Sequence, residues 1–167
     1  MRHEHSSVID PDPVAFFLTW TTYGSWLPGD ARGWVGRHGA IGTPSNSLAR
    51  SAGRLLRTAP VVLGTAQRRT VETTLREQCA FYAWRLHAVA CRTSHVHVVV
   101  SAPDRDPTDV LRSLKAWSSR RLSEAGAKRT VPWWTKSGSV RRIYGMDGVS
   151  RVVEYVLECQ DVPRRRK

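Results

Sequence analysis

Hydrophobic residues recur along the chain with two different periods, and each period predicts one kind of secondary structure. Runs rich in β-branched and aromatic residues, bounded by turn-forming residues, predict strands. The predicted strands are 14–23, 84–93, 95–102 and 138–145. Apolar residues three or four positions apart predict amphipathic helices. The predicted helices are 66–82, 106–126 and 146–160.

The order of these elements indicates the topology. Strand, long loop, helix, two strands, helix, strand and helix follow one another, which is the split βαβ pattern of ferredoxin-like α+β domains. We expect a four-stranded antiparallel sheet with helices on one face, plus an extra C-terminal helix that carries Tyr155. Residues 14–160 are predicted to form a single domain, preceded by a flexible leader, 1–13, and followed by a basic tail, 161–167.

A long insertion, 24–65, separates the first strand from the first predicted helix. It begins with a segment rich in glycine and proline, which break regular structure. It also contains Trp26 and Trp34, so we expect it to fold back on the domain rather than to act as a flexible linker. A short helix is expected within it, starting at Ser45 or Ser47.

The strands 84–93 and 95–102 are joined by a tight polar connection, which indicates an antiparallel hairpin. Because side chains alternate between the faces of a strand, the first of these strands is expected to present two sets of residues. The two sets are Leu86, Ala88 and Ala90 on one face and His87, Val89 and Cys91 on the other.

The net charge of the chain indicates what kind of molecule the protein binds. The 167 residues include 26 Lys and Arg against 14 Asp and Glu, a formal net charge of +12. Such an excess favours a polyanionic partner, most often a nucleic acid. The alternative is a basic protein whose charged surface is merely solvated. The apolar fraction of 41% is sufficient for a hydrophobic core.

The cysteine count and the hydropathy of the chain argue against several classes of protein. Three cysteines without a CxxC pair argue against a disulfide framework and against a zinc ribbon. No apolar run approaches the roughly 20 residues of a membrane span, and the N-terminal residues lack the apolar segment of a signal peptide. We therefore expect a cytoplasmic, nucleoid-associated protein with no membrane partner.

His95 and His97 begin the strand 95–102 and are separated by one valine. Residues two apart in a strand point to the same face, so the imidazoles are expected side by side, roughly 7 Å apart at the backbone. Neutral imidazole is a good ligand for divalent metals. Such a pair also occurs by chance, and a metal site needs a third ligand and an open position for substrate. The pattern alone leaves both interpretations open.

Tyr155 lies at the margin of the apolar stripe of the last predicted helix. A tyrosine there commonly packs with its hydroxyl at the rim of the core. If the helix crosses the sheet near His95 and His97, the phenol becomes a candidate nucleophile toward phosphorus. The resulting phosphotyrosine would conserve the energy of the phosphodiester bond for rejoining.

Four segments in this order resemble a known family. They are FFLTWTTYGSWLPGDARGW, SHVHVVV, LKAWSSRRL, and PWWTKSGSVRRI with VEYVLECQ, over most of residues 15–160. The chain resembles the HUH single-tyrosine transposases of the single-strand insertion-sequence type, and among them the REP-associated tyrosine transposases. The resemblance implies metal-dependent nicking and rejoining of single-stranded DNA at hairpins on a ferredoxin-like fold. By position, His95 and His97 would bind Mg²⁺ or Mn²⁺, and Tyr155 would form a covalent 5′-phosphotyrosine and release a 3′-hydroxyl.

The chain departs from the family pattern at the third metal ligand. Relatives have a glutamine one turn after the tyrosine, whereas here a cysteine takes that position and Gln160 follows it. Gln160 lies about 140° from Tyr155 around an ideal helix, and Glu158 about 60° from it. Gln160 is favoured by its match to family variants, with Glu158 as the alternative. Tyr144 is a second candidate nucleophile.

Basic and aromatic residues near these segments are candidate DNA contacts. Cationic side chains of the helix 106–126 and the strand 138–145 are expected either to meet phosphates or to form a solvated basic face. These residues are Arg112, Lys115, Arg120, Arg121, Arg141 and Arg142, with residues 164–167 of the tail as further candidates. Trp26, Trp133 and Trp134 are expected either to stack on unpaired bases or to cap the ends of the core.

Two functions therefore compete. The first is a transposase that nicks and rejoins single-stranded DNA with Mg²⁺ or Mn²⁺. The second is a catalytically inactive protein that binds single-stranded or hairpin DNA on the same fold. A third function, an unrelated metal-dependent hydrolase, is disfavoured because the sequence offers no further cluster of Asp, Glu and His ligands. The sequence leaves open whether the protein is a monomer or a homodimer whose active sites combine residues of two chains.

Overall fold

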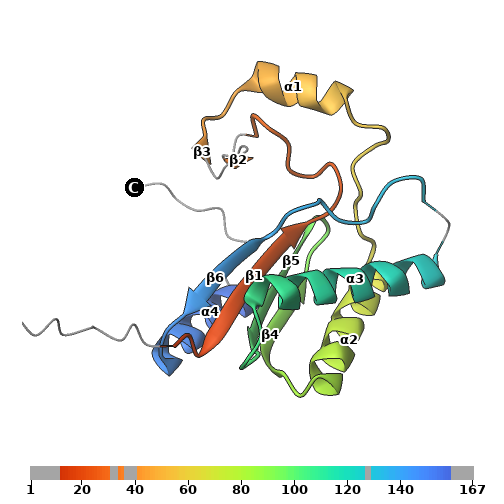
Figure 1. Ribbon diagram of the computed structural model, residues 1–167. Helices are drawn as coiled ribbons and strands as arrows, with labels where there is room; N and C mark the ends of the chain where they lie inside the picture. Colours follow the sequence, from red (N-terminus) through yellow and green to blue (C-terminus); the bar gives the residue numbers. More distant parts are fainter. Residues whose placement is uncertain (1–11, 31–33, 36–40, 127–128, 159–167) are drawn as a thin grey trace, which may run out of the picture.

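A four-stranded antiparallel sheet is the main element of the computed structural model, which describes residues 12–30, 34–35, 41–126 and 129–158 (Figure 1). The strands are β1 (Ala15–Thr21), β4 (Arg85–Cys91), β5 (His95–Ser101) and β6 (Ser139–Ile143). They lie in the order β4-β5-β1-β6, with β1 between β5 and β6. This order is that of the split βαβ arrangement, so the predicted ferredoxin-like α+β fold is confirmed.

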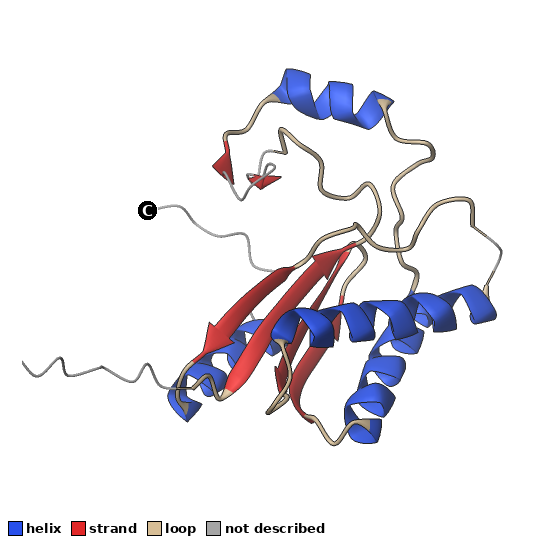
Figure 2. Ribbon diagram, in the orientation of Figure 1, coloured by secondary structure: helices blue, strands red, loops and turns tan. Residues whose placement is uncertain are grey.

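Helices cover both faces of this sheet. They are α2 (Thr65–Phe81), α3 (Pro107–Ala125) and α4 (Met146–Glu158). Figure 1 shows α2 and α3 on one side of the sheet and α4 on the other, and Figure 2 shows the same layers coloured by type of element. Among the described helices, α4, which carries Tyr155, is thus the one that covers this second sheet face.

The protein has two hydrophobic cores, one on each face of the sheet, and the alternation of side chains along a strand decides which core each buried residue joins. On β1, Phe16, Leu18 and Trp20 join the core beneath α2 and α3, and Ala15 joins the core beneath α4. On β5, the even-numbered valines belong to the first core and Val99 belongs to the second. Odd-numbered positions of both strands thus face α4, because successive side chains of a strand point to opposite faces.

A β-bulge in β4 changes the predicted division of that strand. The register with β5 shifts between Leu86 and Ala88, so His87 is the extra residue. Consequently Leu86 packs with the core beneath α2 and α3, while Ala88 and Ala90 lie beneath α4. The prediction that Leu86 shares a face with Ala88 is wrong because a bulged residue inverts the alternation on one side of it.

The insertion contains short regular elements and is tied to the end of the sheet. It includes β2 (Trp34–Val35), β3 (Ile41–Gly42) and α1 (Asn46–Arg54). The Ser45 hydroxyl caps α1, so of the two predicted helix starts, Ser45 and Ser47, the first is confirmed. The fully buried Thr22 donates a hydrogen bond from Oγ1 to the carbonyl of Val61 at 2.6 Å. The N–H of Leu63 donates to the carbonyl of Thr93 at 2.7 Å, so the end of the insertion lies next to the start of β5.

Several predicted segments lie outside the described residues. The leader 1–13 is described only at residues 12 and 13, and both the basic tail 161–167 and Gln160 lie beyond the described part of the chain. Among the helices that are described, none is both long enough and apolar enough to cross a membrane.

Candidate functional site

His95 and His97 lie side by side on the sheet face that α4 covers. In the register of the sheet, His95 is opposite Thr21 and His97 is opposite Thr19. The centroids of the two imidazoles are 4.8 Å apart. The prediction that this spacing places both rings on one face is therefore confirmed, and a rigid central strand holds them there.

His97 is held by contacts from β1. Its ring stacks on Phe17 with the centroids 5.4 Å apart, and a hydrogen bond of 2.9 Å joins Nδ1 to the Oγ1 of Thr19. The residue is only 8% exposed. Burial, followed by the charges of His95 and Arg92, lowers the pKa of His97 to about 3. His97 is therefore a neutral imidazole near pH 7, which is the form that binds metals.

Tyr155 projects from α4 toward this histidine. The helix buries Val149, Val152 and Val156 against the sheet, and this packing sets the tyrosine at the margin of the buried stripe. The Tyr155 ring lies edge-on to His97 and to Phe17, with centroid distances of 6.3 and 6.2 Å. With 36% of its surface exposed, it is accessible to a macromolecular substrate. A single chain thus brings the histidine and the tyrosine together.

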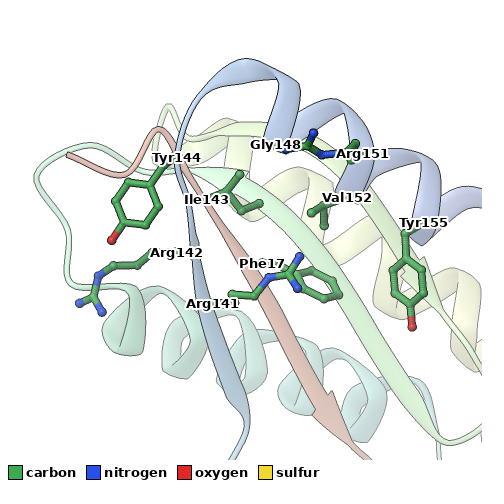
Figure 3. A pocket seen from close by; sticks show the side chains of 9 residues that line it. All are labelled: Phe17, Arg141, Arg142, Ile143, Tyr144, Gly148, Arg151, Val152 and Tyr155. Atoms are coloured by element: carbon green, nitrogen blue, oxygen red, sulfur yellow. The ribbon is translucent and has the colours of Figure 1, made fainter. Parts of the chain in front are cut away.

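The second candidate nucleophile lies farther from the histidines. Tyr144 precedes α4, is largely exposed, and lines the far end of the cavity that Tyr155 borders (Figure 3). In the described structure it makes no ring contact with either histidine. The arrangement therefore favours Tyr155.

Among the described residues, the adjacent imidazoles of His95 and His97 are the candidate metal ligands. Across the described residues, no group of at least three His, Cys, Asp or Glu side chains could hold a metal ion. Glu158 is exposed at the end of α4 and does not complete such a group, so the structure does not support it as the third ligand. Mg²⁺ commonly retains waters and binds substrate phosphates alongside few protein ligands. The two imidazoles therefore fit a divalent ion that takes its remaining ligands from water and from substrate oxygens.

The arginines of α3 are mostly neutralised by neighbouring carboxylates. Arg112 pairs with Asp109 at 2.7 Å, and Arg120 pairs with Glu124 at 3.1 Å. Arg121 lies 3.5 Å from a carboxylate oxygen of Glu77 on α2 and 3.9 Å from one of Glu124. These exposed pairs weaken the predicted role of α3 as a phosphate-binding face, since each arginine already has an anionic partner.

Lys115 has a structural role in this fold. Its Nζ donates hydrogen bonds to the carbonyls of Thr135, Lys136 and Ser137 at 2.7, 3.1 and 3.0 Å. An ammonium has three donors, so the backbone uses all of them. Burial also lowers the pKa of Lys115. The amine thus fixes the segment that leads into β6, and its role as a DNA contact stays a prediction.

The two arginines of β6 point to different sides of the sheet. Arg141 is opposite Phe17 in register, and its guanidinium carbon lies 5.3 Å from the centre of that ring, on the α4 face. Arg142 is opposite Phe16. Hydrogen bonds from Thr108 chiefly lower the pKa of Asp106, and the charge of Arg142 adds a smaller effect. Of this predicted pair, only Arg141 faces the histidines and Tyr155.

The tryptophans also separate into two groups. Trp133 and Trp134 are 4% and 5% exposed within the core beneath α2 and α3. Because their rings are already covered in the core, this burial favours the alternative that they close the core over the prediction that they stack on bases. Trp26 is 40% exposed and borders a cavity of about 490 Å³ together with Thr19 and Thr21. This cavity adjoins the histidine pair through those two threonines.

Three residues of the site were not singled out from the sequence: Phe17, Thr19 and Arg151. Phe17 and Thr19 belong to the set of odd-numbered positions on β1, which pairing with β5 brings opposite the histidines. Arg151 precedes Tyr155 by four residues on α4, a spacing that places both on one helix face. The two-residue and four-residue spacings can be read from the sequence. The strand register that brings these residues next to the histidines cannot.

Known proteins share this fold and sequence pattern. A family model described as "Transposase IS200 like" matches residues 59–158. A presumed transposase from Deinococcus radiodurans R1 superposes with a TM-score of 0.52 at 16% identity, over 93% of this chain and 98% of that one. The structure of a REP-associated tyrosine transposase bound to a REP hairpin gives a TM-score of 0.49 at 15% identity, over 87% of this chain and 66% of that one. No curated protein matches the chain.

Proposed function

The chain belongs to the IS200-like transposase family, and from this premise we propose that it nicks and rejoins single-stranded DNA through a covalent 5′-phosphotyrosine at Tyr155. One observation carries the proposal. The Tyr155 ring lies 6.3 Å from the ring of His97, on the face where His95 also lies. A nucleophile and two imidazole ligands so arranged suit phosphoryl transfer.

In the proposed step the phenol oxygen of Tyr155 attacks the phosphorus of a phosphodiester. A bond forms between that oxygen and phosphorus, the bond from phosphorus to the 3′-oxygen breaks, and a 3′-hydroxyl leaves. The phenol gives up its proton and the leaving oxygen gains one, so charge and atoms balance. Attack of a 3′-hydroxyl on the phosphotyrosine reverses the step and rejoins a strand without ATP.

The histidines serve this chemistry by holding a cation. His95 and His97 would bind a divalent ion such as Mg²⁺ or Mn²⁺, which stabilises negative charge on the phosphate oxygens when it is bound. Family membership supports metal dependence, because transposases of this family are generally metal-dependent. Thr19 orients His97 through Nδ1, which leaves Nε2 as the nitrogen for ligation.

The DNA that fits this surface is single-stranded. Trp26 and the adjacent hydroxyl-rich cavity suit an unpaired base, since base stacking on an exposed aromatic ring is worth about 1–3 kcal/mol. The sequence resemblance to REP-associated transposases leads us to propose hairpins as the substrates. The cis arrangement of histidine and tyrosine supports action by one chain, whether or not two chains associate.

The test is covalent capture of labelled DNA. Wild type is incubated with a labelled single strand that contains a hairpin and with Mn²⁺, and the denatured products are separated by size. We expect a protein–DNA adduct from wild type and from Tyr144→Phe, and none from Tyr155→Phe. An adduct that persists in Tyr155→Phe would contradict the assignment. DNA binding by every variant without any adduct would instead favour the inactive DNA-binding protein.

A further inference from the structure

A cavity of about 420 Å³ lies between β6 and α4, directly beside Tyr155 (Figure 3). Its walls come from the edge strand β6 and the residue that follows it, from α4 and from one residue of β1. The lining residues are Phe17, Arg141, Arg142, Ile143, Tyr144, Gly148, Arg151, Val152 and Tyr155. The cavity therefore extends the candidate active site toward the edge of the sheet.

Three arginines line this cavity, but Arg142 lies opposite Phe16 in the register of the sheet, so Arg141 and Arg151 are the two that face Tyr155. The guanidinium of Arg141 lies over Phe17, the same ring that stacks on His97 and contacts Tyr155 edge-on. Arg151 lies one turn before Tyr155 on α4, so its side chain and the phenol share a helix face. One positive side chain thus approaches from the sheet and the other from the helix.

These charges are not matched by carboxylates. No Asp or Glu is among the described residues that line the cavity. Within the described chain, no ion pair involves Arg141 or Arg151, whereas the arginines of α3 pair with Asp109, Glu124 and Glu77. An exposed arginine pair without carboxylates is suited to an external anion, because guanidinium donors bind phosphate oxygens in a fixed geometry.

We propose that Arg141 and Arg151 form a binding site for a backbone phosphate of the single strand, next to the phosphate that Tyr155 attacks. The inference rests on the proposed function and adds a positioning site to it. The strand would run along the α4 face, with a phosphate between the two arginines and the attacked phosphate beside Tyr155 and the histidines. By fixing that neighbouring phosphate, the arginines limit how far the strand can slide before attack.

The experiment measures DNA binding separately from cleavage. The full chain is titrated against a labelled oligothymidine strand in EDTA, by fluorescence anisotropy, over a series of NaCl concentrations. The variants are Arg141→Gln, Arg151→Gln and the double variant. The control, Arg76→Gln, removes the same charge from an exposed arginine on α2 that pairs with Glu72. Arg151→Lys tests whether positive charge alone suffices.

We expect each single variant at the cavity to bind about three- to tenfold more weakly than wild type. The slope of log affinity against log salt should fall by about 0.7 for each phosphate that the variant no longer neutralises. Arg76→Gln should keep the wild-type slope, and Arg151→Lys should recover the slope with part of the affinity. If the cavity variants keep the affinity and slope of Arg76→Gln, the phosphate site is overturned.

Failure of this inference differs from failure of the proposed function. A normal Tyr155 adduct together with unchanged binding by the arginine variants removes the phosphate site and leaves the nickase. Conversely, absence of any adduct together with a reduced salt slope in Arg141→Gln and Arg151→Gln keeps the phosphate site and removes the nickase. Thermal melting of each variant confirms that the fold is intact before binding is compared.

Discussion

The ring of Tyr155 lies 6.3 Å from the ring of His97 in the same chain, with the two planes at 76°. Phe17 contacts both rings: it stacks on His97 and lies edge-on to Tyr155. The sequence leaves open an active site that combines histidines of one chain with the tyrosine of another. This contact supports a site built within one chain.

A mixing experiment tests the cis arrangement. Tyr155→Phe and His97→Asn are each expected to give no covalent adduct, and their mixture is expected to remain inactive because each chain lacks one half of its own site. The adduct assay with labelled hairpin DNA checks this after the two variants have been refolded together. Recovery of a substantial part of the activity in the mixture would show that histidine and tyrosine come from different chains.

The hydrogen bond between Thr19 Oγ1 and His97 Nδ1 predicts a role for Thr19 in metal affinity. In Thr19→Val the Nδ1 of His97 loses its 2.9 Å partner, so the ring is less firmly oriented and its tautomer is no longer fixed. We expect affinity for Mn²⁺ to fall about tenfold, within the range typical for outer-shell partners of metal-binding histidines. Isothermal titration with Mn²⁺ alone measures this without DNA or turnover.

Thr21→Val is the matched control for that measurement. Thr21 lies on the same strand and face, but its hydroxyl bonds the Oγ1 of Thr135 at 3.0 Å rather than an imidazole. We expect its Mn²⁺ affinity to stay near that of wild type. Equal losses in the two variants would assign the effect to β1 packing instead of to orientation of His97.

The sequence predicts those features that depend on the spacing of residues within one strand or helix and on the order of these elements. The two-residue spacing of His95 and His97 specifies a shared face, and the element order specifies the sheet topology. It does not predict burial that arises from distant contacts. Lys115 has a polar helix position in the sequence, yet the loop from Thr135 to Ser137 surrounds its amine in the fold.

The position of Tyr155 required more than its helical pattern. Its place at a stripe margin follows from the period of α4, but which sheet face α4 covers depends on packing of that helix against β4 and β5. The bulge at His87 shows the same limit, because a single extra residue in β4 exchanges the faces on either side of it. Neither feature has a signal within a short window of sequence.

The contacts of Lys115 predict a stability role for that residue. Lys115→Met keeps the length of the side chain but removes the donors to the carbonyls of Thr135, Lys136 and Ser137. We expect the free energy of unfolding to fall by about 1–2 kcal/mol, because hydrogen bonds from a charged donor are removed from a half-buried site. Urea unfolding followed by circular dichroism measures this. In Arg112→Met, whose exposed pair with Asp109 contributes little, the free energy of unfolding should change by less than about 0.5 kcal/mol.

The different burial of Trp26 and Trp134 predicts opposite outcomes for the same substitution. Trp26→Leu removes a ring that is 40% exposed beside the cavity next to the histidines. We expect it to weaken binding of single-stranded DNA by about 1–3 kcal/mol, the value of one stacked base. Trp134→Leu removes a buried ring that packs edge-on against Trp20 at 6.0 Å. It should lower the free energy of unfolding by about 2–4 kcal/mol, while the folded fraction retains its affinity for DNA. Anisotropy titrations and urea unfolding of both variants decide the matter, and a Trp26→Leu protein that binds like wild type would remove Trp26 from the DNA interface.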